Sequence, residues 1–366
     1  MRILLLGEYS NVHNALGRAL RQLGHEVTVA SDGDGWKDYP RDVNLLRESN
    51  TFISSVRYLY RVRKAFRDFR GYDVVQIINP VFLSLKAERI TPYYQYLKKH
   101  NGAVFLGAFG MDHYYVRAGL DCKTFRYSDF NFGKTIRRCE DNDIWIRDWL
   151  KGEKGALNRY IADDCNGIIA GLYEYYVSYA PHYMDKTTFI PFPIDLSVTD
   201  FRQRGTDAKV SFFIGIQRSR SQYKGTDVML RALRRVVERY PDACSLVHVE
   251  SVPFARYRQL LQGSDVLLDQ LYSYTPAMNA LEAMAQGMVV VGGGEPENYR
   301  ILGEKELFPI VNVFPDEEDV YEKLCHIVED RKHLPSLSRD SRIYIERHHD
   351  SLKVARRYLD FWESRL

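Results

Sequence analysis

The sequence has 366 residues, which is enough for about two domains of ordinary size. Its hydrophobic fraction of 45% and charged fraction of 27% are typical of a globular protein and exclude a largely disordered chain. The formal net charge of +3 is too small to indicate a nucleic-acid-binding protein, so we expect no nucleic-acid partner.

The five cysteines are widely spaced, without a Cys-x-x-Cys pair or a Cys/His cluster, so the sequence predicts neither a disulfide framework nor a metal site. The apolar run at the N-terminus is too short for a signal peptide, and no stretch approaches the ~18 apolar residues of a membrane span. We therefore expect a cytoplasmic protein.

Short apolar runs alternate with helical patterns along the chain, as in parallel sheets whose strands are joined by helices. Most runs are continuously apolar, which is expected of strands covered on both faces. No tight hairpin signal such as Asn-Gly interrupts the series. The sequence therefore predicts an α/β fold with two doubly wound parallel sheets. The strands are expected at 2–6, 26–30, 74–78, 103–107, 167–170 and 187–190, and then at 210–215, 244–249, 266–268, 288–291 and 309–313.

Prolines and a polar stretch between Pro191 and Ala208 indicate where the chain leaves one sheet and enters the other. We expect an N-terminal domain at 1–195 and a C-terminal domain at 208–340. Residues 341–366 then form a C-terminal segment, in which 342–366 has the pattern of one long helix.

The first strand ends at Gly7, and a loop to His13 leads into a predicted helix that stops at Gly24. Ligands of open α/β sheets bind beyond the carboxyl ends of the strands, so this loop is expected to line a crevice. A plain structural turn is the alternative.

The strand at 210–215 ends at Gly215 and is followed by a loop with three cations, Arg218, Arg220 and Lys224. Arginine and lysine at a strand end suit the oxygens of a phosphate group. The next helix is expected to be capped by Thr226 or Asp227. A solvated basic loop is the alternative.

A third motif covers residues 272–287. Thr275 has the properties of a helix N-cap, with Pro276 at the first helical position. The free backbone N–H groups of the next residues, Ala277, Met278 and Asn279, would form an anion site. Glu282 is an acid within an apolar helix, and it either caps a structural group or accepts hydrogen bonds from ligand hydroxyls.

The strand at 103–107 leads into Asp112 and His113, and either residue could orient the hydroxyl group of an acceptor. Capping of the loop by Asp112 is the alternative. The aromatic and charged segment 114–160 is expected to recognise the acceptor.

Residues Arg57–Arg70 contain six cations among Tyr, Leu, Val and Phe, a composition that can form a basic amphipathic helix. Such a helix can lie on an anionic membrane and would place the protein at its inner face. The alternative is a helix packed on the sheet with solvated arginines.

The order G-x-x-R…K-G-x-D, then Val252-Pro253 before a helix, then L-E-A-M-A-x-G before V-V-V, resembles retaining glycosyltransferases of family 4. The specific similarity covers residues 210–315. The resemblance implies the GT-B fold, in which two Rossmann-like domains face each other across a cleft.

The resemblance also implies a donor site with a defined role for each motif. Glu282 would hold ribose hydroxyls, Lys224 with Arg218 or Arg220 would hold the diphosphate, and Val252 and Pro253 would present backbone groups to the base. The family usually has a glutamate that contacts the sugar at the position of Tyr274, and this departure puts donor-sugar handling in question. The donor-binding residues expected are Gly7, Gly215, Arg218, Arg220, Lys224, Val252, Pro253, Tyr274, Thr275, Ala277, Met278, Asn279 and Glu282.

The implied reaction is transfer of a sugar from a nucleoside-diphosphate sugar to a hydroxyl of a glycan or lipid-linked glycan, with retention and without a metal or further cofactor. Its catalytic residues would be Asp112, His113, Arg218 and Lys224. Two alternatives stay open. One is a catalytically silent donor-binding homologue, and the other is a nucleotide-sugar 2-epimerase.

Overall fold

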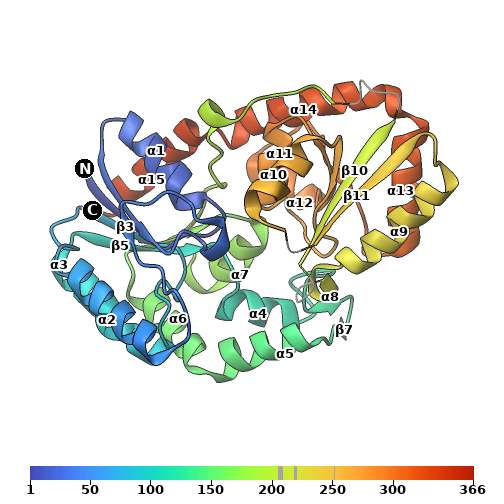
Figure 1. Cartoon of the computed structure of the whole chain (residues 1–366). Coiled ribbons are helices and arrows are strands. Elements are labelled where there is room, and N and C mark those ends of the chain that lie inside the picture. The colour runs from blue at the N-terminus through green and yellow to red at the C-terminus, as the bar shows by residue number, and fades with distance from the viewer. Residues whose placement is uncertain (205–208, 218–220, 251) are drawn as a thin grey trace. The chain divides into compact units, whose positions relative to one another are not determined.

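The computed structural model describes residues 1–204, 209–217, 221–250 and 252–366. The chain forms two compact units, and both contain separate stretches of the sequence (Figure 1). A stretch from the first half of the sequence, Ala118–Asp143, belongs to the second unit. The first unit contains Met1–Arg117, Ile144–Pro193 and Ser351–Leu366, and the second contains Ala118–Asp143 and Ile194–Asp350.

The first unit is built on a parallel seven-stranded sheet in the order β3-β2-β1-β4-β5-β8-β9. The strands predicted for this half are confirmed within one residue at each end, since their apolar side chains are buried on both faces of the sheet. Only β3 was not predicted, because two residues are too short for a recognisable pattern. The strands are β1 (Arg2–Leu6), β2 (Glu26–Ser31), β3 (Val43–Asn44), β4 (Val74–Ile77), β5 (Ala103–Ala108), β8 (Gly167–Ala170) and β9 (Thr187–Phe189).

The chain order of the strands reverses direction between β1 and β4, so the loops after these two strands diverge at the carboxyl edge of the sheet. The helices of this unit are α1 (Val12–Gln22), α2 (Phe52–Phe66), α3 (Thr91–His100), α6 (Glu153–Asp164), α7 (Tyr173–Tyr183) and α15 (Ser351–Glu363). Two further helices, α4 (His113–Leu120) and α5 (Glu140–Ile146), each have residues in both units.

The prediction of one long helix at 342–366 is wrong. The chain forms α14 (Leu334–His348) and then α15, with a break at His349 and Asp350. At the break the carbonyl of His349 accepts a hydrogen bond from the backbone N–H of Ile194, and Asp350 forms a bridge with Ile194. These carbonyl and N–H groups are therefore used outside the helix, and the helix ends.

The second unit is built on a parallel five-stranded sheet in the order β11-β10-β12-β13-β14. Its strands follow the predicted runs, although β14 is shorter than expected. They are β10 (Val210–Ile216), β11 (Cys244–Glu250), β12 (Val266–Leu268), β13 (Val289–Gly292) and β14 (Val311–Asn312). The helices are α8 (Ser221–Lys224), α9 (Thr226–Arg239), α10 (Phe254–Gln262), α11 (Met278–Ala285), α12 (Pro296–Leu302), α13 (Glu317–Glu329) and α14.

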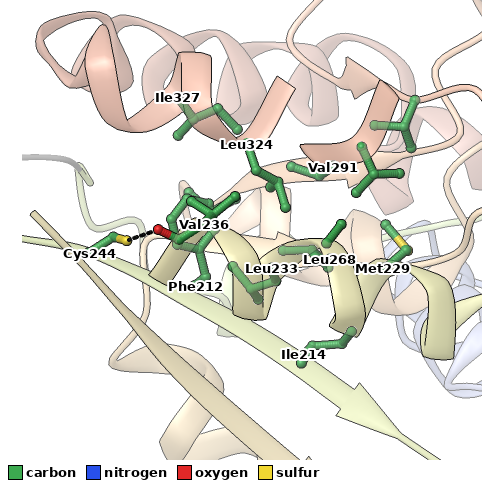
Figure 2. Packing of buried hydrophobic residues seen from close by; sticks show 14 of the residues in the cluster. Phe212, Ile214, Met229, Leu233, Val236, Cys244, Leu268, Val291, Leu324 and Ile327 are labelled. Atoms are coloured by element: carbon green, nitrogen blue, oxygen red, sulfur yellow. Dashed lines mark hydrogen bonds between the residues drawn. The ribbon is translucent and has the colours of Figure 1, made fainter. Parts of the chain in front are cut away.

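The core of this unit lies between its sheet and the helices α9 and α13. Figure 2 shows Leu233 and Val236 of α9 packed with Leu324 of α13 and with Phe212 of β10. All four side chains are buried. Burial of each apolar side chain of this size contributes roughly 1.5–3 kcal/mol, so this layer fixes the sheet edge that carries the loops described below.

Residues 118–143 contain an antiparallel hairpin, which the sequence analysis did not expect. Its strands are β6 (Asn131–Phe132) and β7 (Thr135–Ile136), joined by Gly133 and Lys134. Gly133 has φ of 55°, a conformation that glycine adopts without strain. A glycine in a two-residue connection was the signal, but the flanking strands are too short to be recognised by alternation.

Candidate functional site

The loops that follow β10, β12 and β13 meet at one edge of the second sheet. Ile214 of β10 is paired with Leu268 of β12, and Leu268 with Val291 of β13. Because the strands are parallel, the residues after each of them leave from the same edge. Lys224, Asp269 and the start of α11 are brought together there.

Gly215 lies near the end of β10, where a side chain would collide with the ring of Tyr257. A Cβ at Gly215 would come within 2.6 Å of a ring carbon of Tyr257, which belongs to α10. The glycine therefore makes room for an aromatic side chain. Its expected role at the nucleotide stays a prediction.

The short helix α8 carries Lys224, and its last turn is fixed to the loop after β12. The carbonyl of Lys224 accepts a hydrogen bond from the backbone N–H of Leu271 at 3.0 Å. The next residue, Gly225, has φ of 73° and is the N-cap of α9. A Cβ on Gly225 would come within 2.7 Å of Leu271 and 2.6 Å of Tyr272, so only glycine fits here.

The capping of α9 predicted for Thr226 or Asp227 is wrong. The hydroxyl of Thr226 lies 3.0 Å from that of Ser221, and Asp227 forms an ion pair with Arg231 one turn further along the helix. Neither side chain makes a capping hydrogen bond at the helix start. The turn at Gly225 places both residues inside the helix rather than before it.

Asp269 directly follows β12, and sequence reasoning missed it. Its Oδ1 accepts a hydrogen bond of 3.2 Å from the side-chain amide of Asn279. Burial raises the pKa of Asp269 above its ordinary value, while the charge of Lys224 and the Asn279 hydrogen bond act in the opposite direction. An acid immediately after a buried strand was the signal that could have identified it.

The helix α11 begins later than predicted. Its N-cap is Ala277, with ψ of 178°, and not Thr275. The residues before it are held outside the helix, since the carbonyl of Tyr274 accepts from the N–H of Glu295 and the carbonyl of Thr275 accepts from the hydroxyl of Ser273. Thr275 is buried. The first helical hydrogen bond runs from the N–H of Leu281 to the carbonyl of Ala277, so the amides at the helix start are those of Ala277, Met278, Asn279 and Ala280. Their role as an anion site stays a prediction.

Asn279 and Glu282 are three positions apart on α11 and therefore share one face of it. The side-chain oxygen of Asn279 accepts a hydrogen bond of 2.9 Å from the Tyr257 hydroxyl. Burial raises the pKa of that hydroxyl, and the charges of Asp269 and Glu282 add to the shift. Glu282 is only partly buried, so the face that it shares with Asn279 combines a carboxylate with an amide.

Tyr274 is buried and contacts residues 125–127 of the second unit. Its hydroxyl accepts a hydrogen bond of 2.7 Å from the backbone N–H of Arg126, and the guanidinium of Arg126 lies 4.8 Å from the ring centroid. The rings of Phe125 and Tyr127 pack against Tyr274 at 5.8 and 5.0 Å. The side chain is 2% exposed. Its expected place among the donor-binding residues stays a prediction.

The same stretch is anchored by the acids at the start of α12. Arg126 pairs with Glu295 at 2.7 Å and with Glu297 at 2.5 Å. Glu295 is buried and also accepts hydrogen bonds from the Tyr127 hydroxyl and the Asn312 side chain. The Arg126 side chain is itself exposed, so its ion pairs contribute modestly, whereas the hydrogen bond from Tyr127 to Glu295 is buried and fixes the stretch on the second unit.

Arg137, after the hairpin, contacts the loop that contains Lys224. Its guanidinium donates hydrogen bonds of 2.8 and 3.3 Å to the carbonyls of Gln222 and Tyr223, and it lies 3.2 Å from the centroid of the Tyr272 ring. The carbonyl of Asp129 accepts a further bond of 2.8 Å. Arg137 therefore connects the hairpin, α8 and the loop after β12.

In the first unit, Gly7 has φ of 89°, and a Cβ there would come within 2.2 Å of the Ile78 side chain. The two oxygens of Glu8, which sequence reasoning missed, accept from the backbone N–H groups of His13 and Asn14 at 3.2 and 2.8 Å. Burial raises the pKa of Glu8 to about 8. Glu8 thus occupies the start of α1, and the donor-binding role of Gly7 stays a prediction.

Asp112 is fully buried and forms hydrogen bonds inside the first unit. One oxygen accepts from the backbone N–H of Tyr115 at 2.9 Å, and the other accepts from the Tyr179 hydroxyl at 2.9 Å. Burial raises its pKa to about 7. The backbone N–H of His113 donates to the Asn158 side chain, and its Nδ1 lies 2.8 Å from the carbonyl of Trp149. This geometry favours capping for Asp112, and the acceptor role of both residues stays a prediction.

Pro253 is the N-cap of α10 and Val252 precedes it, while Arg218 and Arg220 lie outside the described residues. Within the described ranges, no group of three or more His, Cys, Asp or Glu side chains is arranged to hold a metal ion. Among the helices that the structure describes, none combines the length and apolar character needed to span a membrane.

The two parallel-sheet units define the GT-B fold, with two Rossmann-like domains. Solved structures match the whole chain at low identity. A sucrose-phosphate synthase from Thermosynechococcus elongatus matches with a TM-score of 0.62 and 13% identity, over 100% of this chain and 99% of that one. The Anabaena protein HepE, in complex with UDP and glucose, matches with a TM-score of 0.60 and 11% identity over 100% of both chains.

A UDP-GlcNAc 2-epimerase from Neisseria meningitidis, bound to UDP-GlcNAc, matches with a TM-score of 0.55 and 12% identity over 100% of both chains. No family model matches the sequence, and no curated protein does. The predicted fold class is confirmed. At these identities the likeness shows the fold alone.

Proposed function

We propose that the protein is a glycosyltransferase that takes a sugar from a nucleoside diphosphate and transfers it to a hydroxyl group. The observation that carries the proposal is the grouping of Lys224, Asn279 and Glu282 beside Asp269 at one edge of the second sheet. Carboxylates at such an edge accept hydrogen bonds from ribose hydroxyls, and cations and helix-start amides hold phosphate oxygens.

In the proposed site, Glu282 holds the ribose and Lys224 holds the diphosphate, with the amides of Met278 and Asn279 beside it. The leaving diphosphate gains negative charge as the sugar bond breaks. A fixed ammonium group and fixed amides aimed at it stabilise the transition state more than the ground state. Arg218 or Arg220 would add a second cation. Retention, and a glycan or lipid-linked acceptor, rest on the sequence resemblance.

The structural similarity supports this proposal, since HepE was solved in complex with UDP and glucose. The test is a thermal-shift screen against UDP, GDP, ADP and dTDP and their sugars, because a ligand that binds the folded state raises its stability. Binding of a nucleotide sugar, followed by release of the nucleoside diphosphate with an acceptor present, is expected. Failure of all these ligands to shift the unfolding temperature would contradict the proposal.

A 2-epimerase is the second candidate, and Asp269 is the observation that favours it. An epimerase needs an acid or base in the site, and Asp269 is a carboxyl group with a raised pKa next to Lys224. The similarity to the Neisseria meningitidis epimerase points the same way. Incubation with UDP-GlcNAc and analysis of the sugar separates the candidates: an epimerised sugar identifies an epimerase, and a transferred sugar identifies a transferase.

The third possibility is a silent donor-binding homologue, suggested by Tyr274 in place of the usual glutamate. Tight nucleotide-sugar binding without release of nucleoside diphosphate, with or without acceptors, would support it.

A further inference from the structure

The helix α2 has two opposite faces of different character. Ser54, Tyr58, Val62 and Phe66 recur every four residues and are buried against the first unit. The Tyr58 hydroxyl accepts a hydrogen bond from the N–H of Ser84, and the Phe66 ring packs on Tyr93 at 4.7 Å. The helix therefore packs on the first unit through this face alone among the two.

The opposite face exposes large apolar side chains over the first turns of the helix. Phe52 is 82% exposed, Ile53 64%, Val56 50% and Tyr60 71%. Phe52, Val56 and Tyr60 follow one another at four-residue spacing, so they form a stripe along the helix surface. Single exposed apolar residues are common, but four neighbours on one helix face indicate a surface that binds something apolar.

Cations follow this apolar stripe toward the C-terminal end of the helix and just beyond it. Arg57, Arg63, Lys64, Arg67 and Arg70 are exposed, and Asp68 is the exposed acid among them. Arg61, in contrast, is bound to the carbonyl of Leu46 and to Glu48. Five cations and one acid next to exposed aromatic residues match an anionic, partly apolar surface.

We propose that this face of α2, formed by Phe52, Ile53, Val56 and Tyr60 with the five exposed cations, binds the surface of an anionic lipid bilayer. The apolar side chains insert between the lipids, and the cations pair with the headgroups, as in helices that lie in the membrane plane. The charge favours a bilayer over a second copy of this chain, because two such faces carry the same positive charge and repel each other.

The experiment is sedimentation of the full-length protein with vesicles of phosphatidylcholine alone or with 30% phosphatidylglycerol, at 50 and 500 mM NaCl. Binding is expected only to the anionic vesicles and should weaken with salt, since salt screens exposed charges. A protein that stays in solution with anionic vesicles at 50 mM NaCl overturns the proposal.

Three variants assign the binding to α2. Arg57→Gln/Lys64→Gln/Arg67→Gln should weaken it about a hundredfold, because each cation near an anionic surface is worth roughly a fivefold change in affinity. Phe52→Ser/Ile53→Ser/Val56→Ser keeps the charge and should also weaken it. Arg331→Gln/Lys332→Gln/Arg339→Gln removes the same charge from exposed positions of the second unit and should leave it unchanged.

Equal losses in the two charge variants would show that net charge alone, and not α2, drives the binding. Light scattering of the same proteins without lipid measures their oligomeric state and so tests the alternative that this face binds a second copy of the chain. A dimer that dissociates in the Phe52→Ser/Ile53→Ser/Val56→Ser variant, together with no vesicle binding, would assign the face to a second copy and reject the bilayer.

Discussion

The hydroxyl of Tyr274 accepts a hydrogen bond from the backbone N–H of Arg126, although the two residues are 148 positions apart in the sequence. The cation of Arg126 lies over the same ring and reaches Glu295 and Glu297 at the start of α12. Tyr274 stands where the family that the sequence resembles has a glutamate, and in this chain it contacts Phe125, Arg126 and Tyr127 of the second unit.

Tyr274→Phe removes the acceptor for the Arg126 N–H and leaves the ring in place. We expect the free energy of unfolding to fall by about 1–2 kcal/mol, which is the usual cost of leaving a largely buried donor without a partner. Urea denaturation of the purified variant measures the change. If Tyr274 acts only in this way, turnover is kept. A variant with unchanged stability but no turnover would instead indicate that the Tyr274 hydroxyl contacts the substrate.

Arg137→Met should loosen the loop that carries Lys224, because it removes the hydrogen bonds to the carbonyls of Gln222 and Tyr223. Hydrogen exchange of the backbone amides from Gln222 to Gly225 should accelerate, and nucleoside-diphosphate affinity should fall about tenfold. Arg137→Lys keeps the charge but not the planar fork, so it should recover little of this loss.

Arg138→Met is the matched control for Arg137. Arg138 is the next residue, exposed, and paired with Asp143 on the surface. Exposed ion pairs contribute little, so this variant should bind the nucleotide like the wild type. If the two variants behave alike, Arg137 does not position the loop.

Glu282→Gln should weaken nucleotide binding without unfolding the protein, since Glu282 is only partly buried. A charged hydrogen bond lost from the ribose costs roughly 1.5–3 kcal/mol, which corresponds to about a ten- to hundredfold lower affinity. Calorimetry with the preferred nucleotide and with its free base separates the effects. The base lacks a ribose, so its affinity should not change.

Lys224→Ala should reduce turnover more than it reduces binding of the nucleoside monophosphate, because the proposed target of Lys224 is the diphosphate, whose charge rises as the bond breaks. The comparison needs the dissociation constants of the monophosphate and diphosphate and kcat for the sugar donor. An equal loss of affinity for the monophosphate and the diphosphate would show that Lys224 does not bind the diphosphate.

Most strands could be predicted from the sequence because burial on both faces makes them continuous apolar runs, as in 266–268 and 289–291. Helix boundaries were less predictable. Thr275 and Thr226 have the right chemistry for caps, but the actual positions are set by contacts with Glu295 and by the tight packing at Gly225. These are tertiary contacts, which the local sequence pattern does not predict.

The residues of the candidate site that lie at strand ends and at a helix start could be predicted, but the side chains that contact these elements from residues 118–143 could not. Lys224, Asn279 and Glu282 were identified from strand ends and a helix start, which are local features. Arg126 and Arg137 were not, because they reach the site through a segment that belongs to the second unit although it lies in the first half of the chain. Only the folded structure brings these cations to Tyr274 and Tyr272.

Asp112 gives the last prediction, which concerns the pH dependence of stability. Burial raises its pKa in the folded protein from 3.8 to about 7, so folding favours the protonated carboxyl group. Its contribution to stability is complete below pH ~4, declines as the pH rises, and is lost above pH ~7. The shift corresponds to an upper limit of roughly 4 kcal/mol.

Asp112→Asn stays neutral at every pH, and its side-chain oxygen can still accept the hydrogen bond from the Tyr115 N–H. The free energy of unfolding of this variant, relative to the wild type, should therefore increase between pH 5 and pH 8. Urea denaturation at the two pH values measures it. Glu8, whose pKa is also raised, is present in both proteins and cancels in the difference. Asp68→Asn, at an exposed position, is the control: it shows how much the pH dependence of the free energy of unfolding changes when a surface carboxyl group is removed. Parallel pH profiles of stability for Asp112→Asn and the wild type would contradict the buried, protonated state. If the profiles are parallel and the variant has also lost turnover, the result would instead support a role of Asp112 in orienting the acceptor hydroxyl.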